Sequence, residues 1–142
     1  MIVGVDFDGT IVKHRYPDIG DEMPGAIETL KALARNGHTL FLWTMRGHPR
    51  KLTERDTLQE AIEWLESRGL NFGYCVNRSP AQFSTSKKQY ANIYLDDSAW
   101  GAPLYRDPRT GDVLYDWLGL AEDLEKAGII KEKDLEKIRS EF

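Results

Sequence analysis

The strongest hydrophobic pattern lies at the N-terminus, where Ile2, Val3 and Val5 form a short β-branched run. Such a run is typical of a strand that is buried on both faces. Three further apolar runs of similar length follow, separated by helical or polar segments, and these also predict strands. They cover residues 39–43, 72–76 and 91–95.

Apolar residues recur at helical spacing between these strands. Positions i, i+3, i+4 and i+7 of the segment 58–65 are apolar, which predicts an amphipathic helix that Gly69 ends. Thr53 with Asp56 resembles a weak capping box for this helix. Pro24 is suited to open an earlier helix, because proline is favoured at the first helical position.

The C-terminal part, residues 113–142, is expected to complete the core with helices. Asp116 is suited to cap one helix, which Gly128 ends, and residues 131–142 predict a second, short amphipathic helix. A turn at 109–111 predicts a small hairpin ahead of them. Strands that alternate with helices indicate an α/β fold, a three-layer Rossmann-like parallel sheet formed by residues 1–142 as one domain.

The composition argues against several classes of protein. The 142 residues are 41% hydrophobic and 30% charged, with a formal net charge of -4. No apolar run approaches the roughly 20 residues that span a bilayer, and no leader-like segment precedes the first strand, so no membrane contact is expected. The acidic balance argues against general nucleic-acid binding. A single cysteine, Cys75, excludes an internal disulfide and fits the cytoplasm.

Candidate chemistry begins where the first strand ends. Asp6 and Asp8 stand at i and i+2, so a strand delivers both side chains to the same side, and Gly9 permits a sharp turn. Ligands bind at the carboxyl ends of strands in open parallel sheets, and two carboxylates there favour a metal ion and acid–base chemistry. The alternative is a plain turn, with Asp6 as a cap.

Polar groups also stand at or near the ends of two other strands. Thr44 follows the second strand, Asp96 and Asp97 follow the fourth, and Lys87 and Lys88 lie in the loop ahead of it. Each has a structural alternative: the threonine can terminate a strand, the aspartates can cap a turn, and the lysines can be a solvated pair. Their joint appearance in this order favours one site.

These residues carry a resemblance to the haloacid dehalogenase (HAD) superfamily of phosphohydrolases. The run Asp-Phe-Asp-Gly-Thr at residues 6–10 matches the first motif of that superfamily, and Thr44 matches the second. A lysine at 87 or 88 matches the third motif, and the pair at 96–97 matches the fourth. The resemblance covers residues 1–98.

The resemblance implies a phosphatase mechanism. Asp6 would attack phosphorus and become phosphorylated, while Asp8 would act as general acid and then as general base. Thr44 and Lys88, which is favoured over Lys87, would neutralise charge on the phosphoryl oxygens.

The same resemblance implies a Mg²⁺ ion and a phosphate-binding loop. Asp6, the backbone carbonyl of Asp8, Asp96 and Asp97 would hold the ion, with Asp97 either as a direct ligand or behind one. The remaining candidates for substrate binding are Gly9, Thr10 and Arg46.

The type of substrate follows from what the chain lacks. Relatives select substrates with a cap domain inserted after the first or third strand, but the corresponding segments, 11–23 and 77–91, are too short for a folded domain. The chain resembles the capless class, whose open sites accept a phosphorylated small molecule or macromolecule, or are covered by a second subunit of a homo-oligomer. A basic rim is a further expectation, formed by Arg46, His48, Arg50, Lys51 and Arg78.

Other functions fit parts of the pattern. A receiver-type signalling module uses similar groups, but its phosphorylated aspartate ends the third strand, whereas Asp6 ends the first. A non-catalytic phosphate-binding module on the same fold is a second alternative, because a fold does not fix a function. A phosphotransferase is the third, although a mutase needs a mobile domain to hold its intermediate.

Overall fold

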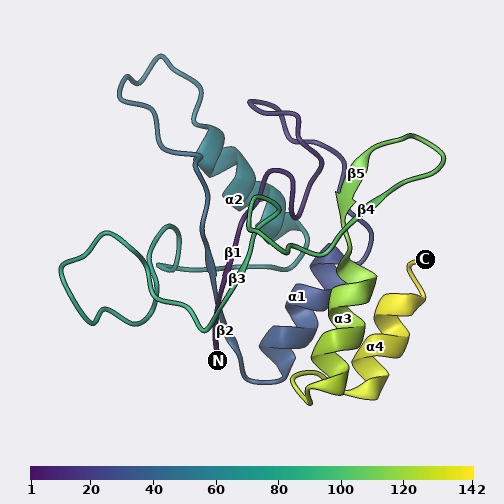
Figure 1. Cartoon of the computed structure of the whole chain (residues 1–142). Coiled ribbons are helices and arrows are strands. Elements are labelled where there is room, and N and C mark those ends of the chain that lie inside the picture. The colour runs from purple at the N-terminus through teal and green to yellow at the C-terminus, as the bar shows by residue number, and fades with distance from the viewer.

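The computed structural model describes residues 1–142 and has an α/β architecture around a small parallel sheet (Figure 1). The sheet contains β1 (Ile2–Val5), β2 (Thr39–Leu42) and β3 (Ile93–Leu95), in the order β2-β1-β3. Val5 pairs with Leu42 on one side and with Leu95 on the other. This register brings the carboxyl ends of all three strands together, with β1 in the middle.

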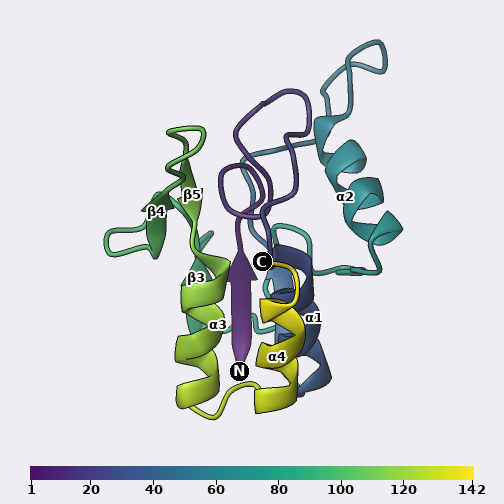
Figure 2. The ribbon, with the colours of Figure 1, turned by 90° about the vertical axis from the view of Figure 1, so that its right-hand side faces the viewer.

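Three helices gather beside this sheet. They are α1 (Ala26–Arg35), α3 (Trp117–Lys126) and α4 (Glu132–Arg139), which pack against one another, and α1 also packs against β2. Figure 2 shows them grouped around β1, while α2 (Thr57–Ser67) stands apart from the group. None of the helices combines the length and the apolar character needed to cross a bilayer.

The prediction of a strand at residues 72–76 is wrong. Only Val76 makes a parallel bridge, to Leu42 of β2. Gly73 takes a left-handed φ of 57°, and the Cys75 N–H donates to the carbonyl of Phe72, so the preceding residues form a turn. A glycine inside a short apolar run thus weakened the strand, since its backbone adopts turn conformations without a Cβ penalty.

Two helices start later than their sequence signals indicate. Pro24 stands before α1, because Gly25 adopts a left-handed φ of 80° that a right-handed helix cannot continue. The capping box with Thr53 does not form. Instead Asp56 alone caps α2, and its carboxylate accepts a hydrogen bond of 2.9 Å from the Gln59 N–H.

The C-terminal elements agree with the sequence pattern. The hairpin forms from β4 (Leu104–Arg106) and β5 (Val113–Tyr115), which pair antiparallel. Asp116 caps α3 by accepting from the Gly119 N–H at 2.9 Å, and Gly128 follows that helix with a φ of 72°.

One cluster of buried apolar side chains runs through the molecule from Val3 to Ile138. Trp117 of α3 is the largest fully buried side chain in it, and α4 contributes Leu135 beside Ile138. Burial of such side chains is worth about 1.5–3 kcal/mol each. The core therefore ties the C-terminal helices to the strand from which Asp6 and Asp8 emerge.

Candidate active site

The carboxyl ends of the three strands open into a pocket of about 460 Å³. Most of the side chains predicted for a phosphatase site are among its lining residues, which also include groups that the sequence did not indicate. The lining residues are Asp6, Asp8, His14, Tyr16, Thr44, Met45, Arg46, Asp96, Asp97 and Ser98.

Three of the pocket carboxylates form a tight cluster. Asp6, Asp96 and Asp97 each place one oxygen within 4.8 Å of the others. Burial, then the charge of Asp96 and a hydrogen bond with Asp97, raise the pKa of Asp6 to about 7. The cluster therefore favours an added positive charge, and a set of hard carboxylate oxygens fits Mg²⁺.

Thr10 connects the ends of β1 and β3. Its hydroxyl donates toward Asp6 (3.1 Å) and Asp97 (3.3 Å), and accepts from the backbone N–H of Asp97 at 3.0 Å. The Thr10 carbonyl accepts a 2.7 Å bond from the Trp117 indole N–H. Thr10 is fully buried and thus holds the carboxylates in place, whereas the sequence predicted a substrate contact.

Gly9 gives the turn after β1 its shape. Its φ is 86°, and a Cβ at this position would collide with the His14 ring and the Asp97 carboxylate. The His14 Nε2 lies 2.9 Å from an oxygen of Asp97. Sequence reasoning missed His14, because a lone histidine in a polar loop gives no periodic signal.

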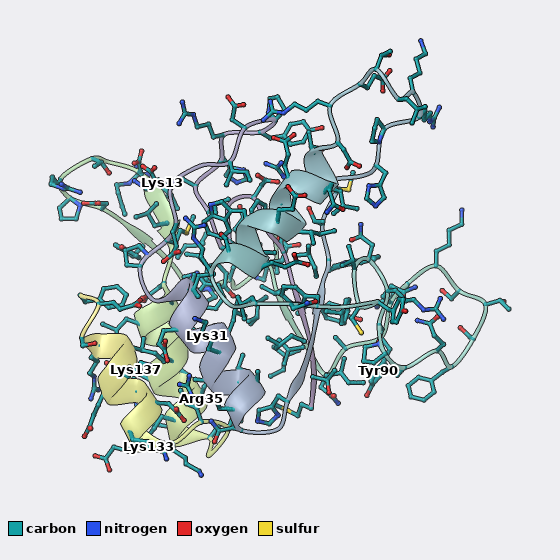
Figure 3. The ribbon with its side chains drawn as sticks, turned by 180° about the vertical axis from the view of Figure 1, so that it is seen from behind. Lys13, Lys31, Arg35, Tyr90, Lys133 and Lys137 are labelled. Carbon is teal, nitrogen blue, oxygen red and sulfur yellow. The ribbon has the colours of Figure 1, made fainter.

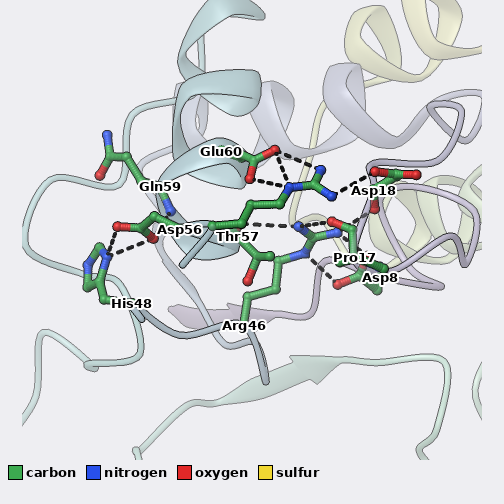
Figure 4. Close-up of polar contacts among 10 residues, drawn as sticks. Asp8, Pro17, Asp18, Arg46, His48, Asp56, Thr57, Gln59 and Glu60 are labelled. Carbon is green, nitrogen blue, oxygen red and sulfur yellow. Dashed lines mark hydrogen bonds and ion pairs between the residues drawn. The ribbon is translucent and has the colours of Figure 1, made fainter. Parts of the chain in front are cut away.

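Asp8 lies in a different environment from the carboxylate cluster. Its two oxygens pair side-on with the guanidinium of Arg46, at 2.8 Å from Nε and 2.9 Å from Nη2 (Figure 4). Bidentate pairs of this kind combine charge with fixed geometry. The two aspartates that follow β1 thus have different surroundings: Asp6 faces other carboxylates, whereas Asp8 faces a cation.

Arg46 uses its remaining donors on backbone carbonyls. Nη1 donates to Pro17 (3.2 Å) and Thr57 (3.1 Å), and Nη2 donates to Asp18 at 2.7 Å. Together with the pair to Asp8, these bonds occupy all five N–H groups of a guanidinium, whose side chain is fully buried. In this arrangement Arg46 has no donor free for a substrate. It joins the loop after β1 and the start of α2 to Asp8.

Thr44 reaches the pocket from the end of β2. Its backbone N–H donates to the Asn77 side chain (2.8 Å), and its hydroxyl accepts from the Arg46 N–H at 3.1 Å. Asn77 has a left-handed φ of 52° and its own N–H donates to Leu42. The sequence signal for Asn77 was available, since asparagine tolerates this conformation where a chain turns.

The structure does not bring the two lysines into the pocket. Lys87 and Lys88 lie in the loop between α2 and β3, and Lys88 lines a separate hollow of about 430 Å³ beside Phe83 and Tyr94. Of the expected basic rim, Arg46 alone lines the pocket, and His48 pairs with Asp56 at 2.8 Å.

Comparisons with known proteins give one relative. A scan against protein-family models found no match, and a search of curated proteins found none either. Among solved structures, a conserved protein of Bacteroides thetaiotaomicron is 41% identical in sequence, with a TM-score of 0.67. The match covers 90% of this chain and 91% of the other.

Proposed function

The chain belongs to the same family as the conserved Bacteroides thetaiotaomicron protein, and we propose that its pocket hydrolyses phosphate monoesters in a Mg²⁺-dependent reaction. The observation that carries this proposal is the convergence of Asp6 and Asp8 with Asp96 and Asp97 at adjacent parallel strand ends. Thr44, just after β2 on the other side of β1, adds a hydroxyl group to these carboxylates.

The reaction proceeds in two steps, which use the two aspartates that follow β1. An oxygen of the Asp6 carboxylate bonds to phosphorus while the ester P–O bond breaks, and Asp8, in its protonated form, gives its proton to the leaving oxygen. The Asp8 carboxylate then takes a proton from the water that attacks the phosphorylated Asp6, which releases inorganic phosphate and restores the Asp6 carboxylate and the protonated Asp8. When bound by Asp6, Asp96, Asp97 and the Asp8 carbonyl, Mg²⁺ supplies positive charge that offsets the phosphoryl oxygens.

A phosphate dianion needs more positive charge than the pocket itself carries. Four ionised carboxylates outweigh a divalent cation and the Arg46 guanidinium by one negative charge, and the dianion adds two more, so a further positive charge from outside the lining residues favours binding. Lys88 is the proposed source of this charge, brought by its loop when substrate binds. The Thr44 hydroxyl oxygen accepts from the backbone N–H of Arg46, so the hydroxyl hydrogen serves as a donor to a phosphoryl oxygen.

A capless HAD-like fold is part of the same proposal. The placement of Asp6 at the end of the middle strand, in the order β2-β1-β3, supports it. Neither the loop after β1 nor the loop before β3 contains a helix or a multi-stranded sheet that would form a cap.

Release of inorganic phosphate from phenyl phosphate and glycerol 2-phosphate tests the proposal. We expect turnover with Mg²⁺, none after exhaustive EDTA treatment, and suppression by excess Ca²⁺, which accepts more ligands and would draw Asp6 out of line. Asp6→Asn should abolish turnover, because a neutral amide cannot form the acyl phosphate. Asp21→Asn, at an exposed position outside the pocket, is the matched control.

Two results would refute the proposal. One is full turnover by the protein without a divalent cation. The other is activity of the folded Asp6→Asn variant above about a tenth of that of the parent, a loss far smaller than removal of a nucleophile produces.

A further inference from the structure

Two apolar side chains stand out in the otherwise polar lining of the pocket. Tyr16 is 62% exposed and Met45 is fully exposed, although both line the cavity with the carboxylates. Exposed apolar groups inside a polar pocket are positioned to contact an apolar part of a ligand.

Tyr16 is a supported platform. The guanidinium carbon of Arg46 lies over its ring, 5.2 Å from the centroid, and lies 5.1 Å from the centroid of Phe7. The five hydrogen bonds of Arg46 fix this guanidinium, and Phe7 is fully buried. The Tyr16 ring therefore has a fixed support, and its exposed part faces the pocket.

The Arg46 guanidinium contacts both Tyr16 and Asp8. It donates hydrogen bonds to Asp8 from Nε and Nη2, and its carbon lies over the Tyr16 ring. Asp8 is the residue that faces the leaving oxygen in the proposed reaction. A group seated on Tyr16 is consequently the leaving group of the ester, and not the phosphoryl group.

The hydrogen bonds of Asp8 favour a leaving group that is acidic. Both Asp8 oxygens already accept guanidinium N–H bonds, so delivery of a proton to a leaving oxygen requires one of these bonds to lengthen. An aryl oxide needs such a proton less than an alkoxide does, because phenols are far stronger acids than alcohols.

We propose that the pocket selects aryl phosphate monoesters, with the aryl ring held between Tyr16 and Met45. This inference rests on the proposed function, because it assumes that Asp8 faces the leaving oxygen. Stacking on Tyr16 supplies the flat surface, and the flexible Met45 thioether adapts to substituents on the ring.

The test compares phenyl phosphate with glycerol 2-phosphate, at saturating Mg²⁺, in the parent protein and in variants. Tyr16→Ala should reduce the preference in kcat/KM for phenyl phosphate about 10-fold, mainly through KM. Tyr16→Phe keeps the ring and should retain the preference to within about twofold. Tyr74→Ala removes another exposed tyrosine, which lies outside the pocket, and is the matched control.

Binding of inert phosphonates separates this inference from the proposed function. By calorimetry, phenylphosphonate should bind about 10-fold more tightly than methylphosphonate, and Tyr16→Ala or Met45→Ala should reduce that ratio. If this pattern holds but no ester is hydrolysed, the aryl subsite stands and the phosphatase proposal fails. If esters are hydrolysed and folded Tyr16→Ala keeps the parent's preference, the phosphatase proposal stands and the aryl subsite is overturned.

Discussion

The sequence predicted that groups at the strand ends and groups in the loop before β3 form one site. The structure holds the pocket and this loop in different ways. In the pocket, side chains bond to partners far away in the sequence, as Thr10 does to Asp97 and Arg46 to Asp8. In residues 78–91, here called the lysine loop, side-chain hydrogen bonds stay within the loop or reach Asn92 and Tyr94, just beyond its end.

The lysine loop lies away from the C-terminal helices and is attached to the rest of the molecule near its ends. Figure 3 shows Tyr90 of the lysine loop on the opposite side from Lys133 and Lys137 of α4. The loop is fastened at its two ends, where Asn77 bonds to Thr44 and Asn92 accepts from the Ile2 N–H. The pocket side chains are thus held by long-range bonds within the protein itself, whereas the lysine loop has no side-chain bond to the pocket carboxylates. Substitutions in each part test the difference.

The largest effect is expected for Arg46→Met. The change leaves the half-buried Asp8 carboxylate and three backbone carbonyls without their donor, so it should cost about 3–5 kcal/mol of unfolding free energy. With Asp8 no longer positioned, kcat/KM should fall about 10³-fold. Urea unfolding and phosphate release measure the two effects.

Arg55→Met is the matched control for this experiment. Arg55 is 44% exposed and pairs with Glu60 and Asp18 at the surface, where solvent screens ion pairs, so its loss should destabilise the protein far less than the loss of Arg46. Equal destabilisation by the two substitutions would mean that the pocket is not held by its buried arginine.

The second effect concerns the lysine loop. Lys88→Ala should lower kcat/KM about 10²-fold, the loss typical of a main electrostatic donor, because the pocket stays negatively charged toward a phosphate dianion even with a divalent cation and Arg46. Lys87→Ala, the adjacent control, should change kcat/KM less than about threefold. Steady-state kinetics on glycerol 2-phosphate measure both. Parent-like rates for both variants would exclude the loop from the site, and the reverse ranking would assign the role to Lys87.

Strand periodicity explains why the carboxylates were found from the sequence. Asp6 and Asp8 come at the end of a β-branched run, and Asp96 and Asp97 directly follow the mainly apolar strand β3, so the register of adjacent parallel strands places them together. The same reasoning failed at residues 72–76, where the local turn at Gly73 outweighed the apolar pattern.

The supporting residues could not be predicted, because their partners are distant in the chain. Arg46 gives the sequence signal of any basic loop residue, and only the fold shows that Asp8 and three carbonyls surround it. Trp117 has the periodicity of a core residue, yet its indole N–H also supports the Thr10 carbonyl. Such roles arise from long-range packing and leave no local pattern.

The smallest effect is a change of stability with pH that belongs to the pocket alone. The pKa of Asp6 is raised to about 7 from an ordinary value of 3.8, so between these values the folded protein keeps a proton that the unfolded chain has lost. The stabilisation is therefore complete below about pH 4 and is lost as the pH rises through 7. Allowing for the partial exposure of Asp6, we expect the metal-free protein to lose about 2 kcal/mol of unfolding free energy over this interval.

Urea denaturation between pH 5 and 8, in EDTA and in excess Mg²⁺, measures this loss. A bound cation replaces the proton and stabilises the folded state, so Mg²⁺ should flatten the decline and raise stability most at pH 8. Asp6→Asn removes the titrating group and should flatten the decline without Mg²⁺. The carboxylates with lowered pKa values act in the opposite sense and at lower pH, where protonation removes their contribution; these are Asp56, Glu60, Asp107 and Asp134. If the unfolding free energy of Asp6→Asn declines with pH as in the parent, the responsible group lies outside the carboxylate cluster. That result would contradict a preformed cation site in the pocket.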